Sequence, residues 1–132
     1  MAANLTSTFS GRKYLSLESF RKNGQGVATP IWFAEHSGIL YAYSEAGAGK
    51  VKRIRNNPRV RVAPCDARGR LEGEWVEAQA RLVEGEEASR AERLLVEKYG
   101  FQKRLLNLFA KLGALFRPRP RAYIAISPAA EK

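Results

Sequence analysis

Residues 39–65 read ILYAYSEAGAGKVKRIRNNPRVRVAPC and place a short basic segment between two alternating runs. The outer runs are rich in β-branched and aromatic residues that alternate with other side chains, which predicts β-strands over about 39–44 and 59–65. The segment between them, 47–58, breaks this alternation. We therefore expect two strands joined by a structured connection.

The connection has the pattern of a short helix. Val51 and Ile54 stand three residues apart and would lie on one face, where they can anchor the helix to a sheet. Pro58 is a stop signal for the helix, because the residue before a proline avoids the helical conformation. These features predict a helical turn or two over about 49–56.

The same connection concentrates positive charge without a balancing acid. Its basic residues, with two more on the next strand, are Lys50, Lys52, Arg53, Arg55, Arg59 and Arg61. Glycines just before the cluster let the backbone approach a ligand closely, and a helix start directs free N–H groups at an anion. Val51 follows Lys50, so the Walker motif and its magnesium-binding hydroxyl are missing. A phosphate cradle and a solvated basic surface both remain open, and the glycines favour the cradle.

Outside this region the sequence predicts four further strands, at about 13–22, 27–34, 73–84 and 121–127. Pro30 lacks the N–H that a central strand needs, so the strand at 27–34 is expected at a sheet edge or with a bulge. Short turns between successive strands indicate antiparallel pairing. Six such strands with peripheral helices predict a mainly β fold that could close into a small barrel.

The period changes to that of a helix over about 86–117, an expected helical insertion before the last strand. Within it, segment 101–116 carries an apolar stripe of Leu and Phe residues surrounded by basic residues. This stripe could pack on its own barrel, on a partner subunit or on a membrane surface. We found no linker or repeat and expect one domain over residues 1–132.

Composition narrows the classes of partner. The 132-residue chain has a formal net charge of +10, which favours nucleic acid, an acidic membrane or a phosphorylated small molecule. The aromatic residues do not interleave with basic ones as a nucleic-acid stacking platform would, so a nucleic-acid partner is disfavoured. No apolar run is long enough to span a bilayer, and no secretory signal is evident, so we expect a cytoplasmic protein.

The residues available for catalysis are few. The sequence has one cysteine and one histidine, which argues against a metal site and excludes an internal disulfide. Cys65 has no histidine near it in sequence and is expected to be a small core residue. His36 is expected in a solvated turn. With no set of acid–base residues evident, an enzymatic reaction here would rely on a cofactor.

Three blocks in order, KYLSLESFRKNGQGVATPIWF, LYAYSEAGAGKVKRIRNNPRVRVAPCDARG and GEWVEAQARLV, resemble the pyridoxamine 5′-phosphate oxidase-like split β-barrels. The resemblance covers about residues 12–84 and the final strand. Its most specific parts are T-P-x-W-F, G-K-V-K-R-x-R-x-N-P and V-A-P-C-D-x-x-G. Among these proteins, the chain looks most similar to the small oxidoreductases that use FMN or the deazaflavin coenzyme F-420.

The resemblance implies a six-stranded antiparallel split β-barrel, assembled as a homodimer with a cofactor groove between the subunits. It implies hydride transfer to a small unsaturated or oxidised compound, and the high positive charge favours F-420 over FMN. A non-catalytic binder of flavin, haem or tetrapyrrole is the other possibility. The residues it assigns to cofactor binding are Thr29, Pro30, Ile31, Trp32, Ser44, Gly49, Lys50, Val51, Lys52, Arg53, Pro64 and Cys65.

Overall fold

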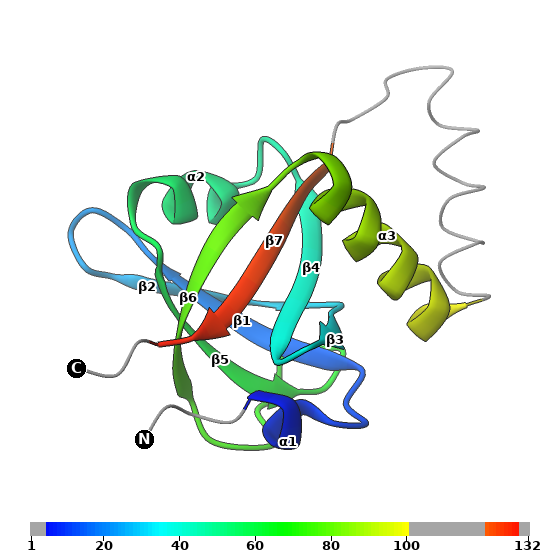
Figure 1. Cartoon of the computed structure of the whole chain (residues 1–132). Helices are drawn as coiled ribbons and strands as arrows, with labels where there is room; N and C mark the ends of the chain where they lie inside the picture. The colour runs from blue at the N-terminus through cyan, green and yellow to red at the C-terminus, as the bar shows by residue number, and fades with distance from the viewer. Residues whose placement is uncertain (1–4, 101–120, 130–132) are drawn as a thin grey trace.

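The computed structural model describes residues 5–100 and 121–129, and these form one antiparallel sheet with three helices around it (Figure 1). The strands run in the order β2-β1-β5-β6-β7-β4-β3 across the sheet. They are β1 Tyr14–Phe20, β2 Gly26–Ile31, β3 Ala34–His36, β4 Ile39–Glu45, β5 Arg59–Cys65, β6 Val76–Val83 and β7 Arg121–Pro128. The helices are α1 Leu5–Phe9, α2 Gly49–Asn56 and α3 Gly85–Tyr99.

The predicted mainly β, antiparallel architecture with peripheral helices is confirmed, but the strand count is not. The described residues form seven strands rather than six, because the strand expected over 27–34 is divided into β2 and β3. The break lies at Phe33, whose backbone N–H donates to the Tyr99 hydroxyl at 2.9 Å and whose carbonyl accepts from it at 2.9 Å. A distant side chain therefore takes the place of a ladder partner at this point.

The short connection between β2 and β3 requires the sheet to curl. β2 and β3 lie at opposite edges of the sheet, yet only Trp32 and Phe33 separate them in sequence. Three Cα–Cα steps reach at most about 11 Å, so the two edges must approach each other. They are not paired with each other, and the sheet is thus an open, curled one of the split-barrel type rather than the closed barrel that strand number alone allowed.

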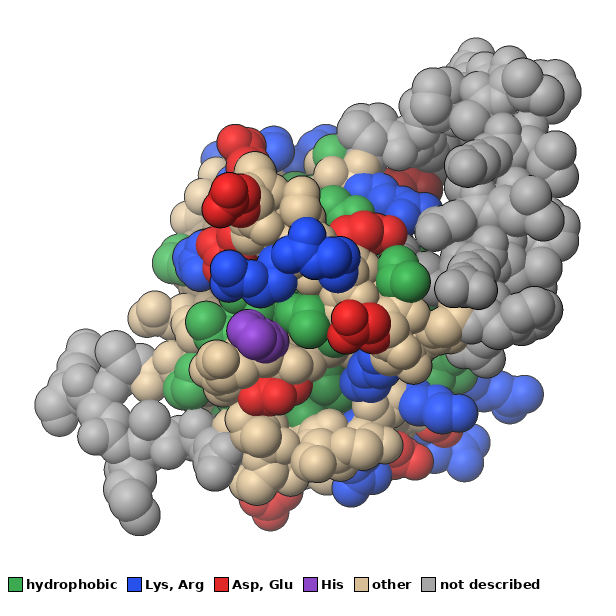
Figure 2. All heavy atoms as spheres, turned by 45° about the vertical axis from the view of Figure 1, so that its right-hand side comes forward, with side chains coloured by type: hydrophobic (Ala, Val, Ile, Leu, Met, Phe, Trp, Pro, Cys, Tyr) green, Lys and Arg blue, Asp and Glu red, His purple; other side chains and the backbone are tan. Residues whose placement is uncertain are grey.

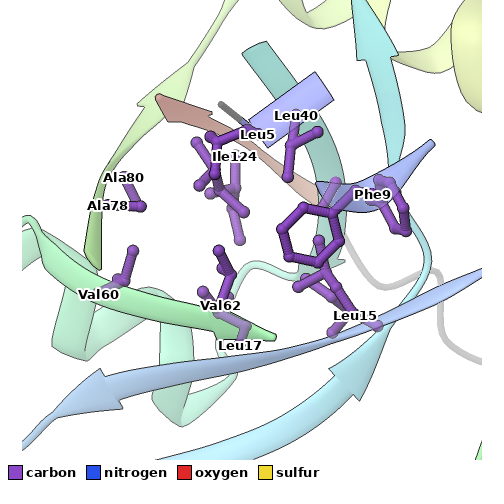
Figure 3. Close-up of a cluster of buried hydrophobic side chains, with 14 of the residues drawn as sticks. Leu5, Phe9, Leu15, Leu17, Leu40, Val60, Val62, Ala78, Ala80 and Ile124 are labelled. Carbon is purple, nitrogen blue, oxygen red and sulfur yellow. The ribbon is translucent and has the colours of Figure 1, made fainter. Parts of the chain in front are cut away.

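The inner face of the curled sheet holds the main hydrophobic core (Figure 3). Helices α1 and α2 lie at opposite ends of the sheet and both contribute to this core, α1 with Leu5 and Phe9 and α2 with Ile54 (Figure 1). The sequence interpretation missed α1. The buried members of the cluster are Leu5, Phe9, Leu15, Leu17, Ile31, Phe33, Leu40, Ala42, Ile54, Val60, Val62, Ala78, Ala80, Ile124 and Ile126.

Helix α3 covers the outer face of the sheet beside β4 and β7. Its buried Ala91 packs in a cluster with Tyr41 and Ala125, which point outward from those strands. α3 confirms the first part of the helical insertion expected over 86–117. The segment 101–116 lies outside the described residues. Within the described part of the chain, no helix combines the length and apolarity needed to cross a membrane.

Candidate functional site

Helix α2 forms where the spacing of its apolar residues predicted it. Val51 is 0% exposed and Ile54 is 3% exposed, so both anchor the helix to the sheet, and the basic residues occupy its other faces. The helix starts after Ala48, which provides no side-chain cap, and its first turn contains no acidic residue. The first amides of a helix have no intrahelical acceptor, and here no side-chain cap binds them.

The two arginines that follow α2 are already paired. Arg59 forms a two-pronged interaction with Glu77, with nitrogen–oxygen distances of 3.1 and 2.9 Å. Arg61 donates to Glu18 at 2.5 Å, and its guanidinium lies 5.0 Å from the Trp75 ring centroid. Both pairs bridge neighbouring strands, because β5 lies between β1 and β6. These two cations stabilise the outer face of the sheet and are not the ones that face the cavity beside α2.

That cavity has a volume of about 480 Å³ and lies between α2 and the end of β1. Its polar lining residues are Arg21, Lys22, Lys52, Arg53, Asn56 and Asn57, with Phe20 as its apolar wall. The lining thus presents four cations and two amides but no carboxylate. Arg21 and Lys22 were not among the predicted site residues, although a basic pair directly before the Asn23-Gly24 turn was a visible signal.

The cations at this site crowd one another. Arg53 donates through Nε to the Ser19 hydroxyl at 2.7 Å, and burial together with the nearby Arg21 lowers the pKa of Arg53. Burial and then Arg53 lower the pKa of Lys50, against the opposing effect of Glu45. Such shifts arise where positive groups are partly desolvated and lie close to one another. A bound phosphate or carboxylate would relieve the repulsion.

Gly49 allows this arrangement at the helix start. A Cβ added at Gly49 would lie 2.8 Å from Nη1 of Arg53. Because that distance is shorter than ordinary contact, any larger residue would displace the guanidinium. The glycine therefore lets Arg53 lie across the first turn of α2, close to the uncapped amides.

The predicted site residues on β2 and β5 are brought together across β1. Leu15 of β1 pairs with Ile31 on one side and with Pro64 on the other. Pro30 is exposed on β2, which confirms its expected place at a sheet edge. The buried Oγ1 of Thr29 has no hydrogen-bond partner within the described part of the structure. An unsatisfied buried hydroxyl costs about 1–3 kcal/mol, so a ligand that bonds to it would gain affinity.

Three other predicted site residues pack against or within the protein. Trp32 lies beyond the end of β2, where its ring stacks on Tyr99 at 4.5 Å between centroids. Val51 is fully buried. Cys65 is 2% exposed, and burial first, with nearby acidic groups, raises its thiol pKa to about 11. This confirms Cys65 as a buried residue and argues against a thiolate nucleophile.

Two groups of candidate residues are therefore present. Lys52 and Arg53 share the basic cavity, and Ser44 lies on β4, 9% exposed, a few residues before α2. The β2 and β5 residues flank Leu15 of β1. Leu15 lies four positions before Ser19 on the same strand, and Ser19 contacts Arg53. Four residues of strand span about 13 Å. The structure thus separates a basic end from a mostly apolar end along one strand.

One face of the molecule carries charge of both signs. On the face shown in Figure 2, Lys and Arg side chains are interspersed with Asp and Glu side chains. His36 is exposed, as expected, but it ends β3 rather than lying in the turn that follows. Over residues 5–100 and 121–129, no group of three or more His, Cys, Asp and Glu side chains could hold a metal ion. The acid-free lining distinguishes the α2 cavity from this mixed surface.

Solved structures of three other proteins have a similar fold. A conserved hypothetical protein of Mycobacterium tuberculosis is 20% identical, with a TM-score of 0.67 over 96% of this chain and 79% of that one. The heme storage protein HutZ of Vibrio cholerae is 14% identical, with a TM-score of 0.68 over 96% and 89% of the two chains. An FAD-binding protein of Mesorhizobium loti is 19% identical, with a TM-score of 0.55 over 95% and 85%.

The family follows from the sequence itself. The family model for pyridoxamine 5′-phosphate oxidase matches residues 1–130, so the chain belongs to the pyridoxamine 5′-phosphate oxidase family. The resemblance of the three sequence blocks to this family is thereby confirmed. No curated protein sequence matches the chain.

Proposed function

We propose that the protein is an oxidoreductase that binds the deazaflavin coenzyme F-420 and uses it for hydride transfer to a small unsaturated or oxidised organic compound. The observation that carries this proposal is the cavity beside α2, which presents four cations and no carboxylate in a chain of the pyridoxamine 5′-phosphate oxidase family. The FAD-binding neighbour from Mesorhizobium loti adds support for a cofactor of the flavin type.

The residues present fit a phosphorylated cofactor. Ser44, Gly49, Lys50, Lys52 and Arg53 would hold the phosphate and the chain that leads from it, because the uncapped start of α2 and the crowded cations both favour an anion. Val51 would act only through its backbone, since its side chain belongs to the core.

The ring of the cofactor would lie against the apolar end of the site. Thr29, Pro30, Ile31 and Trp32 would run along it, and the unpaired Oγ1 of Thr29 would find a polar partner there. Pro64 and Cys65 would border the same groove from β5, and the groove would be completed by a second copy of the chain. The cofactor supplies the hydride chemistry when it is bound. The protein's residues bind it, orient it and exclude water.

The choice between cofactors depends on charge. F-420 carries a phosphodiester and an oligoglutamate tail, so it offers several anionic groups to the four cations of the cavity. FMN carries one phosphate, for which fewer cations would suffice. FMN is therefore the second candidate. A binder without turnover is the third, and the similarity in fold to HutZ, a heme storage protein, keeps haem among its ligands.

Turnover separates the enzyme from the binder. We expect the protein to oxidise reduced F-420 in the presence of a quinone, enone or nitro compound, and the return of the oxidised cofactor's absorbance and fluorescence measures this turnover. Activity with reduced FMN instead would select the second candidate. Absence of turnover with both cofactors, together with haem binding that gives a sharp absorbance band, would replace the proposal with a carrier function.

A further inference from the structure

The loop 66–75 joins β5 to β6 and reaches the apolar end of the proposed cofactor site. A Cβ added at Gly69 would lie 3.6 Å from Cδ of Pro30, so this part of the loop lies against β2. Strand β1 separates β2 from β5, and the loop therefore extends past β1. Its residues come next to a proline that the proposed function assigns to the cofactor ring.

Hydrogen bonds hold the loop on both sides of Leu71. The Asp66 carboxylate accepts from the Arg70 amide at 2.9 Å, and the Asp66 amide donates to the Arg70 carbonyl at 3.0 Å. On the other side, the Glu72 amide donates to the Pro64 carbonyl at 2.8 Å. Leu71 lies between these two anchored residues, so the backbone fixes where its side chain begins.

Leu71 is exposed on the same face of the sheet as Pro30. Within the described part of the chain it is the one exposed large hydrophobic residue, at 45% of its surface. It bridges to Cys65, which pairs with Tyr14, and directly paired residues face the same side of a sheet. Ser16, two residues after Tyr14, shares this side and pairs with Pro30. Single exposed leucines are common on protein surfaces, so the position of Leu71 matters more than its exposure.

The distance between Leu71 and Pro30 is also short enough for both to border one ligand. Gly69 lies against Pro30, and the two Cα–Cα steps from Gly69 to Leu71 cover at most about 8 Å. An acceptor that approaches a cofactor bound along Pro30 would therefore come close to Leu71.

The loop does not share the positive charge of the cavity beside α2. Its ionisable residues are Asp66, Arg68, Arg70, Glu72 and Glu74. Three acids thus face two arginines, and Glu72 also pairs with Arg12 at 3.5 Å. This end of the site has no excess of cations to attract an anionic acceptor, and an apolar contact is what Leu71 can offer.

We propose that Leu71 is a specificity-determining residue that favours uncharged, apolar acceptors over charged ones. This inference rests on the function proposed above, because it needs an acceptor to approach a cofactor along Pro30. Leu71 contacts the apolar body of the acceptor and removes it from water. It takes no part in the transfer of hydride.

Steady-state kinetics with two quinones tests this role. The wild type and Leu71→Ser are assayed with the reduced cofactor that supports turnover, and with menadione or an anionic naphthoquinone sulfonate as acceptor. We expect the KM for menadione to rise about five- to ten-fold with kcat nearly unchanged, because the variant loses about half of a leucine's apolar contact. The preference for menadione over the sulfonate should fall accordingly. Comparison of this preference between variants cancels the different reduction potentials of the quinones.

Leu71→Met is the matched control, because it keeps an apolar side chain of similar volume and should keep the wild-type preference. Both variants should unfold at the wild-type temperature, since Leu71 is exposed and its replacement leaves no core cavity. An equal loss with both quinones, or a loss that accompanies weaker cofactor binding, would overturn the role of Leu71 and leave the proposed function in place. Absence of wild-type turnover with either cofactor would refute the proposed function and this inference with it.

Discussion

Replacement of Arg53 by alanine is expected to weaken cofactor binding by about 10- to 100-fold with a small loss of stability. The guanidinium lines the basic cavity and lies over the start of α2, where it can donate to a phosphate or carboxylate oxygen. A hydrogen bond to a charged group contributes about 1.5–3 kcal/mol, and each 1.4 kcal/mol corresponds to a factor of ten in Kd. The variant also loses the hydrogen bond to Ser19, which costs about 1 kcal/mol of folding free energy.

The assay is titration of each variant with F-420 and with FMN, followed by fluorescence at fixed ionic strength. Arg55→Ala is a control of equal charge, because Arg55 lies on the same helix but not in the cavity lining, and it should change Kd by less than about two-fold. Ser19→Ala breaks the same hydrogen bond but keeps the cation, so its affinity should remain close to that of the wild type. Equal affinities of Arg53→Ala and Arg55→Ala would refute the assignment of the cavity to the cofactor.

Three further predictions concern single residues. Gly49→Ala should displace the Arg53 guanidinium and weaken cofactor binding several-fold. Thermal unfolding should change little, because the clash involves only the end of a flexible side chain. An unchanged Kd would contradict this prediction. Tyr99→Phe removes the hydroxyl that binds both backbone groups of Phe33 and should lower the free energy of unfolding by about 1–3 kcal/mol, measured by urea titration. The Cys65 thiol should resist a thiol reagent at pH 8 in the folded protein and react on unfolding, and fast reaction without unfolding would disprove its burial.

Local sequence patterns predicted those parts of the fold that depend on residues close together in the chain. The spacing of Val51 and Ile54, with Pro58 beyond them, predicted α2, and the missing N–H of Pro30 predicted an edge strand. These predictions succeeded because helix periodicity and proline geometry act over a few residues. The division between β2 and β3 was not predictable in this way. The two halves pair with different strands, β1 and β4, and the backbone of Phe33 between them bonds to Tyr99, 66 residues away in sequence.

The residues of the candidate site were also only partly predictable from the sequence. Residue spacing alone could not divide the cluster of six basic residues. Only the family resemblance left Arg59 and Arg61 out of the cofactor site. Their pairing with Glu77 and Glu18 depends on strand register, which only the folded sheet defines. The addition of Arg21 to the cavity likewise depends on how the end of β1 approaches α2.

Direct titration of the wild-type protein tests whether this chain binds a phosphorylated cofactor of the deazaflavin or flavin type. We predict saturable binding of F-420 at micromolar concentration or below, tighter than the binding of FMN at the same ionic strength. If neither cofactor binds at micromolar concentration, this proposal is wrong, and the basic cavity beside α2 is then only part of the solvated surface.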